Sequence, residues 1–195
     1  NGYDDGTFQP YKEIARGEAL KIILLSLDRM EENMAEESTT TAFQDVHPEA
    51  WYSNYIAVGT QKNIISGYPD GLFYPDKPIN LAEALKMVLE AAGTFREPYV
   101  SPTLETSPAP DVPLESWYVD YATYALTNAL TYVDAEGNLN AEDAVTRGEL
   151  ADLIYRLHHP GAYTGRIEYG KATYYGWSWE GVNTASGEIM SQHDY

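Results

Sequence analysis

"GYDDGTFQPYKEIARGEALKI" occupies residues 2–22 and returns as "GYPDGLFYPDKPINLAEALKM" at residues 67–87. The two segments align without a gap, from Gly2 on Gly67 to the end of both copies. A third and weaker copy, "TYVDAEGNLNAEDAVTRGELADL", occupies residues 131–153. Repetition over this length indicates one supersecondary unit used several times, because a single copy is too small to bury a core of its own.

A second element recurs in front of the later two copies. "AFQDVHPEAWYSNYIA" begins at residue 42 and reappears as "APDVPLESWYVDYATYA" from residue 109. Their tryptophans, Trp51 and Trp117, take the same place in the two copies. This element is missing before Gly2, so we interpret the chain as a fragment or a processed piece of a longer protein.

Each repeat is expected to form a helix, a loop rich in Gly, Pro and Asp, and a second helix. Apolar residues of the second helix follow a helical stripe in two of the copies: Leu81, Leu85, Val88, Leu89 and Ala92, then Leu150, Leu153, Ile154 and Leu157. The predicted units are the second half of a first repeat at 1–27, a second repeat at 42–93, a third repeat at 109–158 and a tail at 159–195.

The second helix opens with related signatures, "IARGE" at 14–18, "INLAE" at 79–83 and "VTRGE" at 145–149. Asn80 and Thr146 are suited to be N-caps, and the glutamate three residues later can close a capping box. Capping does not explain Arg16 and Arg147. A cation in the first helical turn faces the positive end of the helix dipole, so these arginines need another reason.

Composition excludes several classes of function. The net charge is −18, which argues against binding to nucleic acid or to an anionic membrane surface. The chain has no cysteine and therefore no disulfide or thiolate metal site. No apolar run approaches the roughly 18 residues of a membrane span. The adjacent His158 and His159 have no helical partner at i+4, so we expect no metal and no cofactor.

The paired blocks "F-x-D-V…W" and "G-Y-x-D-G-x-F-x-P…(I/V)-T-R-A-E" resemble the S-layer homology domains of bacterial surface proteins, over roughly residues 2–157. The resemblance implies a mainly α fold of three helix–loop–helix modules with pseudo-threefold symmetry. It also implies an extracellular location at the cell wall or cell surface. The implied function is non-catalytic attachment, through an anionic secondary polysaccharide that is linked to peptidoglycan and often carries a pyruvylated sugar.

In this family the motif arginine is the main contact to the anionic ligand, a role that maps by position to Arg16 and Arg147. We expect their guanidinium groups at the mouths of clefts between repeats. The other predicted polymer-binding residues are Trp51, Trp117, Gly67 and Tyr68. For both tryptophans, burial tendencies favour packing in the core over contact with a ligand.

The chain also departs from the family pattern. The second repeat has Leu81 in place of the arginine, so its groove is expected to lack the charged contact. In the third repeat we align Tyr132 with Tyr68. That alignment makes the loop up to Val145 two residues longer than the loop up to Ile79 (145 minus 132 against 79 minus 68).

The tail resembles the opening of the double-psi β-barrel of rare lipoprotein A-like proteins, through "GKATYYG" at 170–176 and "TASGE" at 184–188. Some members of that family are lytic transglycosylases, and Glu188 occupies the position of their glutamate. Less than half of a barrel is present, so Glu188 is a catalytic candidate only if the barrel is complete.

Two alternatives to wall attachment therefore stay open. The chain could be the targeting region of a peptidoglycan-cleaving lytic transglycosylase whose barrel follows. It could also be a structural module that self-associates into an assembly or filament, because the missing half-repeat leaves apolar helix surface for another chain to cover.

Overall fold

The computed structural model describes residues 6–29, 43–95, 106–161, 182–183 and 189–190, and these residues are mainly helical. The helices are α1 (Arg16–Ser26), α2 (Ser53–Gln61), α3 (Leu81–Ala92), α4 (Val119–Thr127) and α5 (Arg147–His158). Two short antiparallel strands, β1 (Val182–Asn183) and β2 (Ile189–Met190), lie in the tail. The predicted mainly α fold class is confirmed.

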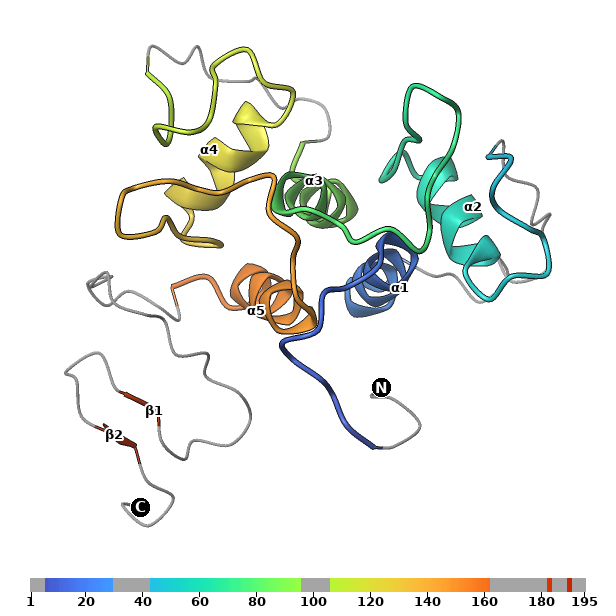
Figure 1. Ribbon diagram of the computed structural model, residues 1–195, viewed down its shortest axis with the longest axis horizontal. Helices are drawn as coiled ribbons and strands as arrows, with labels where there is room; N and C mark the ends of the chain where they lie inside the picture. The colour runs from blue at the N-terminus through green and yellow to red at the C-terminus, as the bar shows by residue number, and fades with distance from the viewer. Residues whose placement is uncertain (1–5, 30–42, 96–105, 162–181, 184–188, 191–195) are drawn as a thin grey trace.

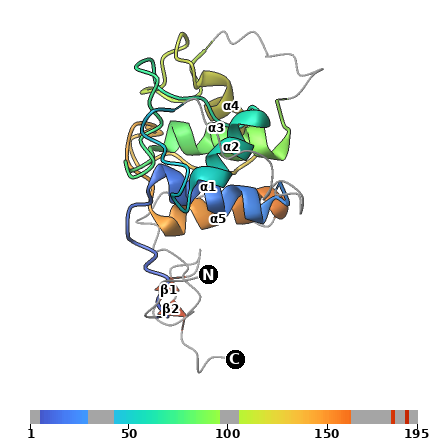
Figure 2. The same ribbon diagram turned by 90° about the vertical axis from the view of Figure 1, so that its right-hand side faces the viewer.

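Helices α1, α3 and α5 form the centre of the molecule, with α2 on the outside of α1 and α4 on the outside of α3 (Figures 1 and 2). Each outer helix therefore packs on the second helix of the preceding repeat. The predicted apolar stripes lie in the core, since Leu85, Val88, Leu89 and Leu150 are fully buried. Leu81 and Leu157 are partly buried at the edge of the core.

The three segments that precede the central helices are joined by a closed ring of backbone hydrogen bonds. The Ile14 N–H donates to the Val145 carbonyl (3.0 Å), Val145 donates to Ile79 (2.9 Å), and Ile79 donates back to Ile14 (3.0 Å). All three side chains are buried. Each repeat thus donates one bond and accepts one bond, and the connectivity returns to its starting point.

Two further rings run in the opposite direction at the first turns of the helices. Residues at equivalent positions donate to the repeat that follows: Arg16 to Lys77, Leu81 to Asp143 and Arg147 to Lys12, then Gly17 to Pro75, Ala82 to Ala141 and Gly148 to Pro10. The first N–H groups of a helix have no partner within it. Here they bind carbonyl groups of another repeat, so the helix ends also tie the repeats together.

Helix capping follows the sequence prediction in two repeats. The side chains of Asn80 and Thr146 accept from the N–H groups of Glu83 and Glu149, and both capping boxes are complete. In the first repeat Ala15 has no side chain that could cap the helix. Its N–H still donates to the Glu18 carboxylate at 3.3 Å, so half of the box remains.

The predicted alignment of Tyr132 with Tyr68 is wrong. The Tyr68 N–H donates to the Leu72 carbonyl, and the equivalent bond in the third repeat runs from Asp134 to Asn138. The number of residues from Tyr68 to Asp134 equals the number from Leu72 to Asn138. It also equals the spacing between the equivalent tryptophans, Trp51 and Trp117. The loops are therefore equal in length, and the third repeat has an aspartate where the second has a tyrosine.

The aspartate of the F-x-D-V block holds this loop. Asp45 accepts from the N–H groups of Phe73 (3.0 Å) and Tyr74 (2.6 Å), and Asp111 does the same for the equivalent loop of the third repeat. Tyr74 has a positive φ of 56°, which is uncommon for a non-glycine residue. The carboxylate therefore fixes a loop conformation that the backbone alone disfavours.

Substituting Asp45 by alanine should lower the free energy of unfolding by about 1–3 kcal/mol, because two backbone donors lose their acceptor. Urea denaturation followed by circular dichroism measures the effect. Gln44→Ala removes an exposed neighbouring side chain and should change stability by less than about 0.5 kcal/mol. Equal stability of the two variants would show that the carboxylate does not hold the loop.

Candidate functional site

Arg16 lies inside the protein, where it joins the first repeat to the loop of the second. Its Nε–H donates to the Phe73 carbonyl at 3.1 Å, and its Nη1 lies 2.9 Å from the Glu83 carboxylate. The guanidinium carbon lies 4.7 Å from the centre of the Tyr68 ring and 4.8 Å from that of Phe73. Such cation–π and ion-pair contacts are strong when they are shielded from water.

Arg147 repeats this arrangement between the third repeat and the first. Its Nε–H donates to the Phe8 carbonyl at 2.9 Å, and its guanidinium carbon lies 5.0 Å from the centre of the Phe8 ring. Phe8 and Phe73 are equivalent residues in the gapless alignment of the first two copies. At the third position of this cycle Leu81 replaces the arginine and packs against both apolar clusters of the core.

The prediction that these guanidinium groups lie at cleft mouths is wrong. Arg16 is 4% exposed and Arg147 is 5% exposed. The cost of a cation in the first helical turn is offset by the carbonyl and the aromatic ring of the next repeat. Both arginines are therefore clamps between repeats in this structure.

Gly67 and Tyr68 belong to the same loop. A Cβ at Gly67 would lie 2.3 Å from Phe43 Cε1 and 2.9 Å from the Leu72 carbonyl oxygen, so any side chain there would displace the Phe43 ring and the loop backbone. The Tyr68 hydroxyl donates to the Glu83 carboxylate, which also binds Arg16. Burial and this hydrogen bond raise the pKa of Tyr68 to about 12.

The core position favoured for the two tryptophans is also wrong. Trp51 is 52% exposed and Trp117 is 57% exposed, each just before an outer helix. Each stands beside a lysine of the central helix, with Lys21 Nζ 5.3 Å from the Trp51 ring centre and Lys86 Nζ 5.8 Å from that of Trp117.

A tyrosine completes each group. The Trp51 and Tyr55 ring centres are 6.5 Å apart, and those of Trp117 and Tyr121 are 6.4 Å apart. We call Trp51, Tyr55 and Lys21 the Trp51 cluster, and Trp117, Tyr121 and Lys86 the Trp117 cluster. The lysines were not among the predicted site residues, although Lys21 and Lys86 align with each other in the first two copies.

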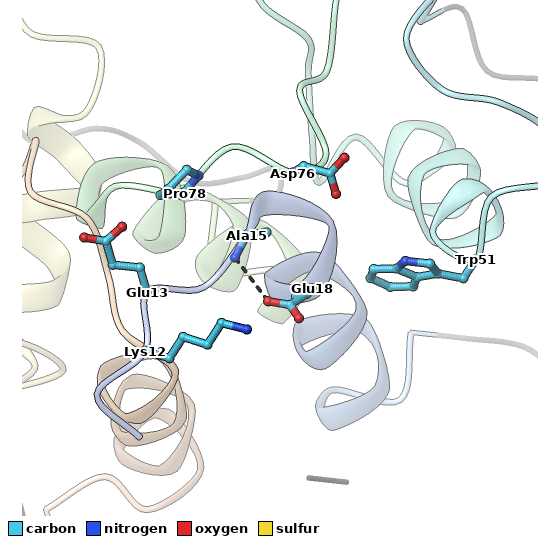
Figure 3. Close-up of a pocket in the computed structure, with 7 residues that line it drawn as sticks. All are labelled: Lys12, Glu13, Ala15, Glu18, Trp51, Asp76 and Pro78. Atoms are coloured by element: carbon cyan, nitrogen blue, oxygen red, sulfur yellow. Dashed lines mark hydrogen bonds between the residues drawn. The ribbon is translucent and has the colours of Figure 1, made fainter. Parts of the chain in front are cut away.

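A pocket of about 570 Å³ lies beside the Trp51 cluster. Figure 3 shows its lining, with Trp51 facing the first turn of α1 across the opening and Lys12 approaching from the segment before that helix. Asp76 and Pro78 of the second repeat also line it. The pocket therefore combines a flat aromatic face, a lysine and carboxylates from two repeats.

Other predicted features lie elsewhere. Residues 170–176 and Glu188 are outside the described residues. Within the described part of the chain, no three His, Asp or Glu side chains form a group that could hold a metal ion. None of the described helices combines the length and apolar character needed to cross a bilayer.

Removing the Arg16 side chain should lower the free energy of unfolding by about 3 kcal/mol even without any ligand, because Glu83 and the Phe73 carbonyl lose their partner. Urea denaturation of Arg16→Ala measures this loss. Lys77→Ala, which removes an exposed lysine, should cost less than about 1 kcal/mol. An unchanged stability of Arg16→Ala would mean that the arginine is not a clamp.

Tyr68 should also make the free energy of unfolding depend on pH in the alkaline range. Its folded pKa of about 12 lies above the unfolded value near 10, so its contribution is complete below pH 10 and is lost as the pH rises toward 12. Between those values the wild type should lose stability more steeply than Tyr68→Phe, which cannot ionise. Urea denaturation of both proteins across this range tests it, and parallel pH profiles would contradict it.

Comparison with known proteins identifies the repeats. The family model of the S-layer homology domain matches residues 42–85 and 110–151. The cellulosome-anchoring protein of Acetivibrio thermocellus is 39% identical over 82 residues, which cover 42% of this chain and 18% of that protein. Cell surface glycoprotein 1 of the same organism is 28% identical over 170 residues, covering 84% of this chain and 7% of the relative.

The surface-layer 125 kDa protein of Lysinibacillus sphaericus is 27% identical over 158 residues, covering 80% of this chain and 12% of that protein. The chain thus spans less than a fifth of the length of each of these relatives. The matched family and its surface-layer members confirm the predicted extracellular location at the cell wall or cell surface. The family model matches nothing after residue 151, and the likeness of the tail to rare lipoprotein A has no support.

The two complete helix–loop–helix copies, matched at residues 42–85 and 110–151, are S-layer homology domains.

Proposed function

We propose that this chain attaches its parent protein to the cell wall by binding an anionic secondary polysaccharide linked to peptidoglycan. The observation that carries the proposal is the repeated placement of an exposed tryptophan beside a lysine, in the Trp51 and Trp117 clusters. A tryptophan that is half exposed leaves a large apolar face in water. A sugar ring that stacks on this face would remove that surface from water.

The lysines supply the charge that an acidic sugar needs. Lys21 and Lys86 lie over the tryptophan rings, and Lys12 lines the pocket beside Trp51. The net charge of −18 opposes the approach of an anionic polymer. Salt screens this repulsion beyond about 10 Å at 0.1 M, whereas a lysine acts at contact distance. Binding is therefore feasible at physiological salt, with a slowed encounter.

The arginines have an indirect part in this proposal. Arg16 and Arg147 hold the loops of neighbouring repeats through Phe73 and Phe8. Gly67 and Tyr68 shape the loop that Arg16 binds. We assign all four to positioning of the groove walls, and the pseudo-threefold unit as a whole to presentation of the two clusters.

Two equivalent clusters on one chain can engage one polymer at two points. After the first contact, the second becomes intramolecular and raises the apparent affinity without any new kind of interaction. The name of the cellulosome-anchoring relative agrees with an attachment role. No observation on the described residues favours the transglycosylase or the filament alternative.

Sedimentation with purified cell-wall sacculi tests the proposal. The Trp51→Ala, Trp117→Ala double variant should bind at least about tenfold more weakly than the wild type, since both stacking faces are lost. Trp51→Phe with Trp117→Phe should retain most of the binding because a flat ring remains.

Leu114→Ala removes another exposed apolar side chain and serves as the matched control, with no expected effect. Sacculi stripped of their secondary polymer should no longer retain the wild type. Wild-type binding by the double alanine variant, or by stripped sacculi, would contradict the proposal.

A further inference from the structure

The cleft between the second and third repeats differs from its counterpart between the first and second. It forms a pocket of about 230 Å³ whose lining includes Leu81, Asp134 and Leu139. In the alignment of the repeats these residues are the equivalents of Arg16, Tyr68 and Phe73. The same three hydrogen-bond rings frame both places, so the backbone is shared and the side chains differ.

Two substitutions explain why the space beside Arg16 is filled and the equivalent space beside Leu81 is open. In the first of these spaces the Arg16 guanidinium lies against the Tyr68 ring, and the Tyr68 hydroxyl donates to Glu83. Leu81 is shorter than arginine, and Asp134 is much smaller than tyrosine. The volume that these side chains would occupy is therefore left as a pocket.

The chemistry of the open pocket also differs from that of its counterpart. Its floor is apolar, formed by Leu81, Leu139 and Val145. Its polar rim carries the carboxylates of Asp134, Asp143 and others, and no lysine or arginine lines it. Carboxylates only accept hydrogen bonds, so a ligand that binds to them must bring donors. A ligand carboxylate would meet like charges at short range and is disfavoured.

The carboxylates that line the pocket are held by contacts within the protein, and among the described residues no three acidic or histidine side chains form a group that could hold a metal ion. Asp134 accepts from the N–H of Asn138 at 2.8 Å and from the side chain of Asn140 at 2.8 Å. Asp152 is paired with Arg156 at 2.7 Å. Asp134 also accepts from the N–H of Glu136 at 3.0 Å and from the side chain of Asn138 at 3.5 Å, so its acceptor sites are taken. The acceptors for a ligand hydroxyl group are therefore Asp152 and the rim residue Asp143.

We propose that this pocket, which we call the Leu81 pocket, binds an uncharged, hydroxyl-rich sugar unit and excludes the acidic sugars assigned to the tryptophan clusters. Leu81 and Asp143 determine this specificity, because their equivalents elsewhere in the cycle are Arg16 and Lys77. The apolar floor takes the carbon face of the sugar ring, and the acceptors on the rim take its hydroxyl groups. The inference goes beyond the proposed function, since it concerns another cleft and a ligand without charge.

Nuclear magnetic resonance titration of the whole chain tests this pocket directly. Methyl β-N-acetylglucosaminide should shift the backbone amide signals of Leu139 and Asn140, whereas glucuronic acid at the same concentration should not. Absence of shifts with the neutral sugar, equal shifts with the acid, or shifts only with calcium chloride would each overturn the proposal.

Two variants place at Leu81 and Asp143 the residue types found at the equivalent positions, Arg16 and Lys77. Leu81→Arg should fill the pocket and weaken binding of the neutral sugar at least about tenfold. Should that variant not fold, Asp143→Lys changes only an exposed rim residue, and it should reduce the neutral-sugar shifts and introduce shifts with glucuronic acid.

Glu142→Lys makes the same charge change one residue away, outside the pocket lining, and should behave as the wild type. Equal losses in Glu142→Lys and Asp143→Lys would refute the assignment. Sacculus binding that depends on the tryptophans is measured separately. Loss of the tryptophan dependence of sacculus binding would contradict only the proposed function. Absence of the amide shifts would contradict only sugar binding in the Leu81 pocket.

Discussion

The closed ring of hydrogen bonds among Ile14, Ile79 and Val145 is the constraint on which the rest of the structure depends. Each strand-like segment is too short to form a sheet, and each central helix would have unpaired N–H groups at its start. The ring and its two companions satisfy these groups between repeats. One repeat therefore cannot shift along its helix axis without breaking bonds to both of the others.

This constraint explains where the conspicuous side chains lie. The first turn of each central helix is pulled against the loop of a neighbouring repeat, so a long side chain there is enclosed. Arginine suits a position where it can donate to a phenylalanine carbonyl and lie against the phenylalanine ring, as it does at Phe73 and Phe8. Where the loop offers Leu139, a leucine takes its place and the cleft opens. The tryptophans lie on the outer layer, which the rings do not enclose, and stay exposed.

The sequence predicted the helices, the caps and the repeat well, because these follow from local patterns. The stripe from Leu81 to Leu89 and the caps at Asn80 and Thr146 depend only on residues within one turn or two. The hydrogen-bond rings could not be predicted in this way, since each bond joins residues of two different repeats, as Ile14 and Ile79 do. The alignment of Tyr132 with Tyr68 failed because residue identity outweighed the constant spacing of the repeats.

At the candidate site, too, features that depend on neighbouring residues are predictable from the sequence, and contacts between repeats are not. The helix dipole does not account for the motif arginines, and the partners that do account for them lie in another repeat, where the sequence alone cannot place them. Burial tendencies are averages over all tryptophans and carry no information on which layer of this fold a helix start belongs to. The equivalent placement of Lys21 and Lys86 was available in the sequence and would have marked the surface clusters.

The most direct test of polymer binding at the exposed rings follows side-chain N–H signals by nuclear magnetic resonance while solubilised wall polysaccharide is added to the protein. We predict that the indole signals of Trp51 and Trp117 shift together, and that the Nε–H signal of Arg16, bonded to the Phe73 carbonyl, stays where it is. A shift of the Arg16 signal with unmoved indole signals would show that the polymer reaches the clamp and bypasses the exposed rings. That result would contradict attachment through the tryptophan clusters.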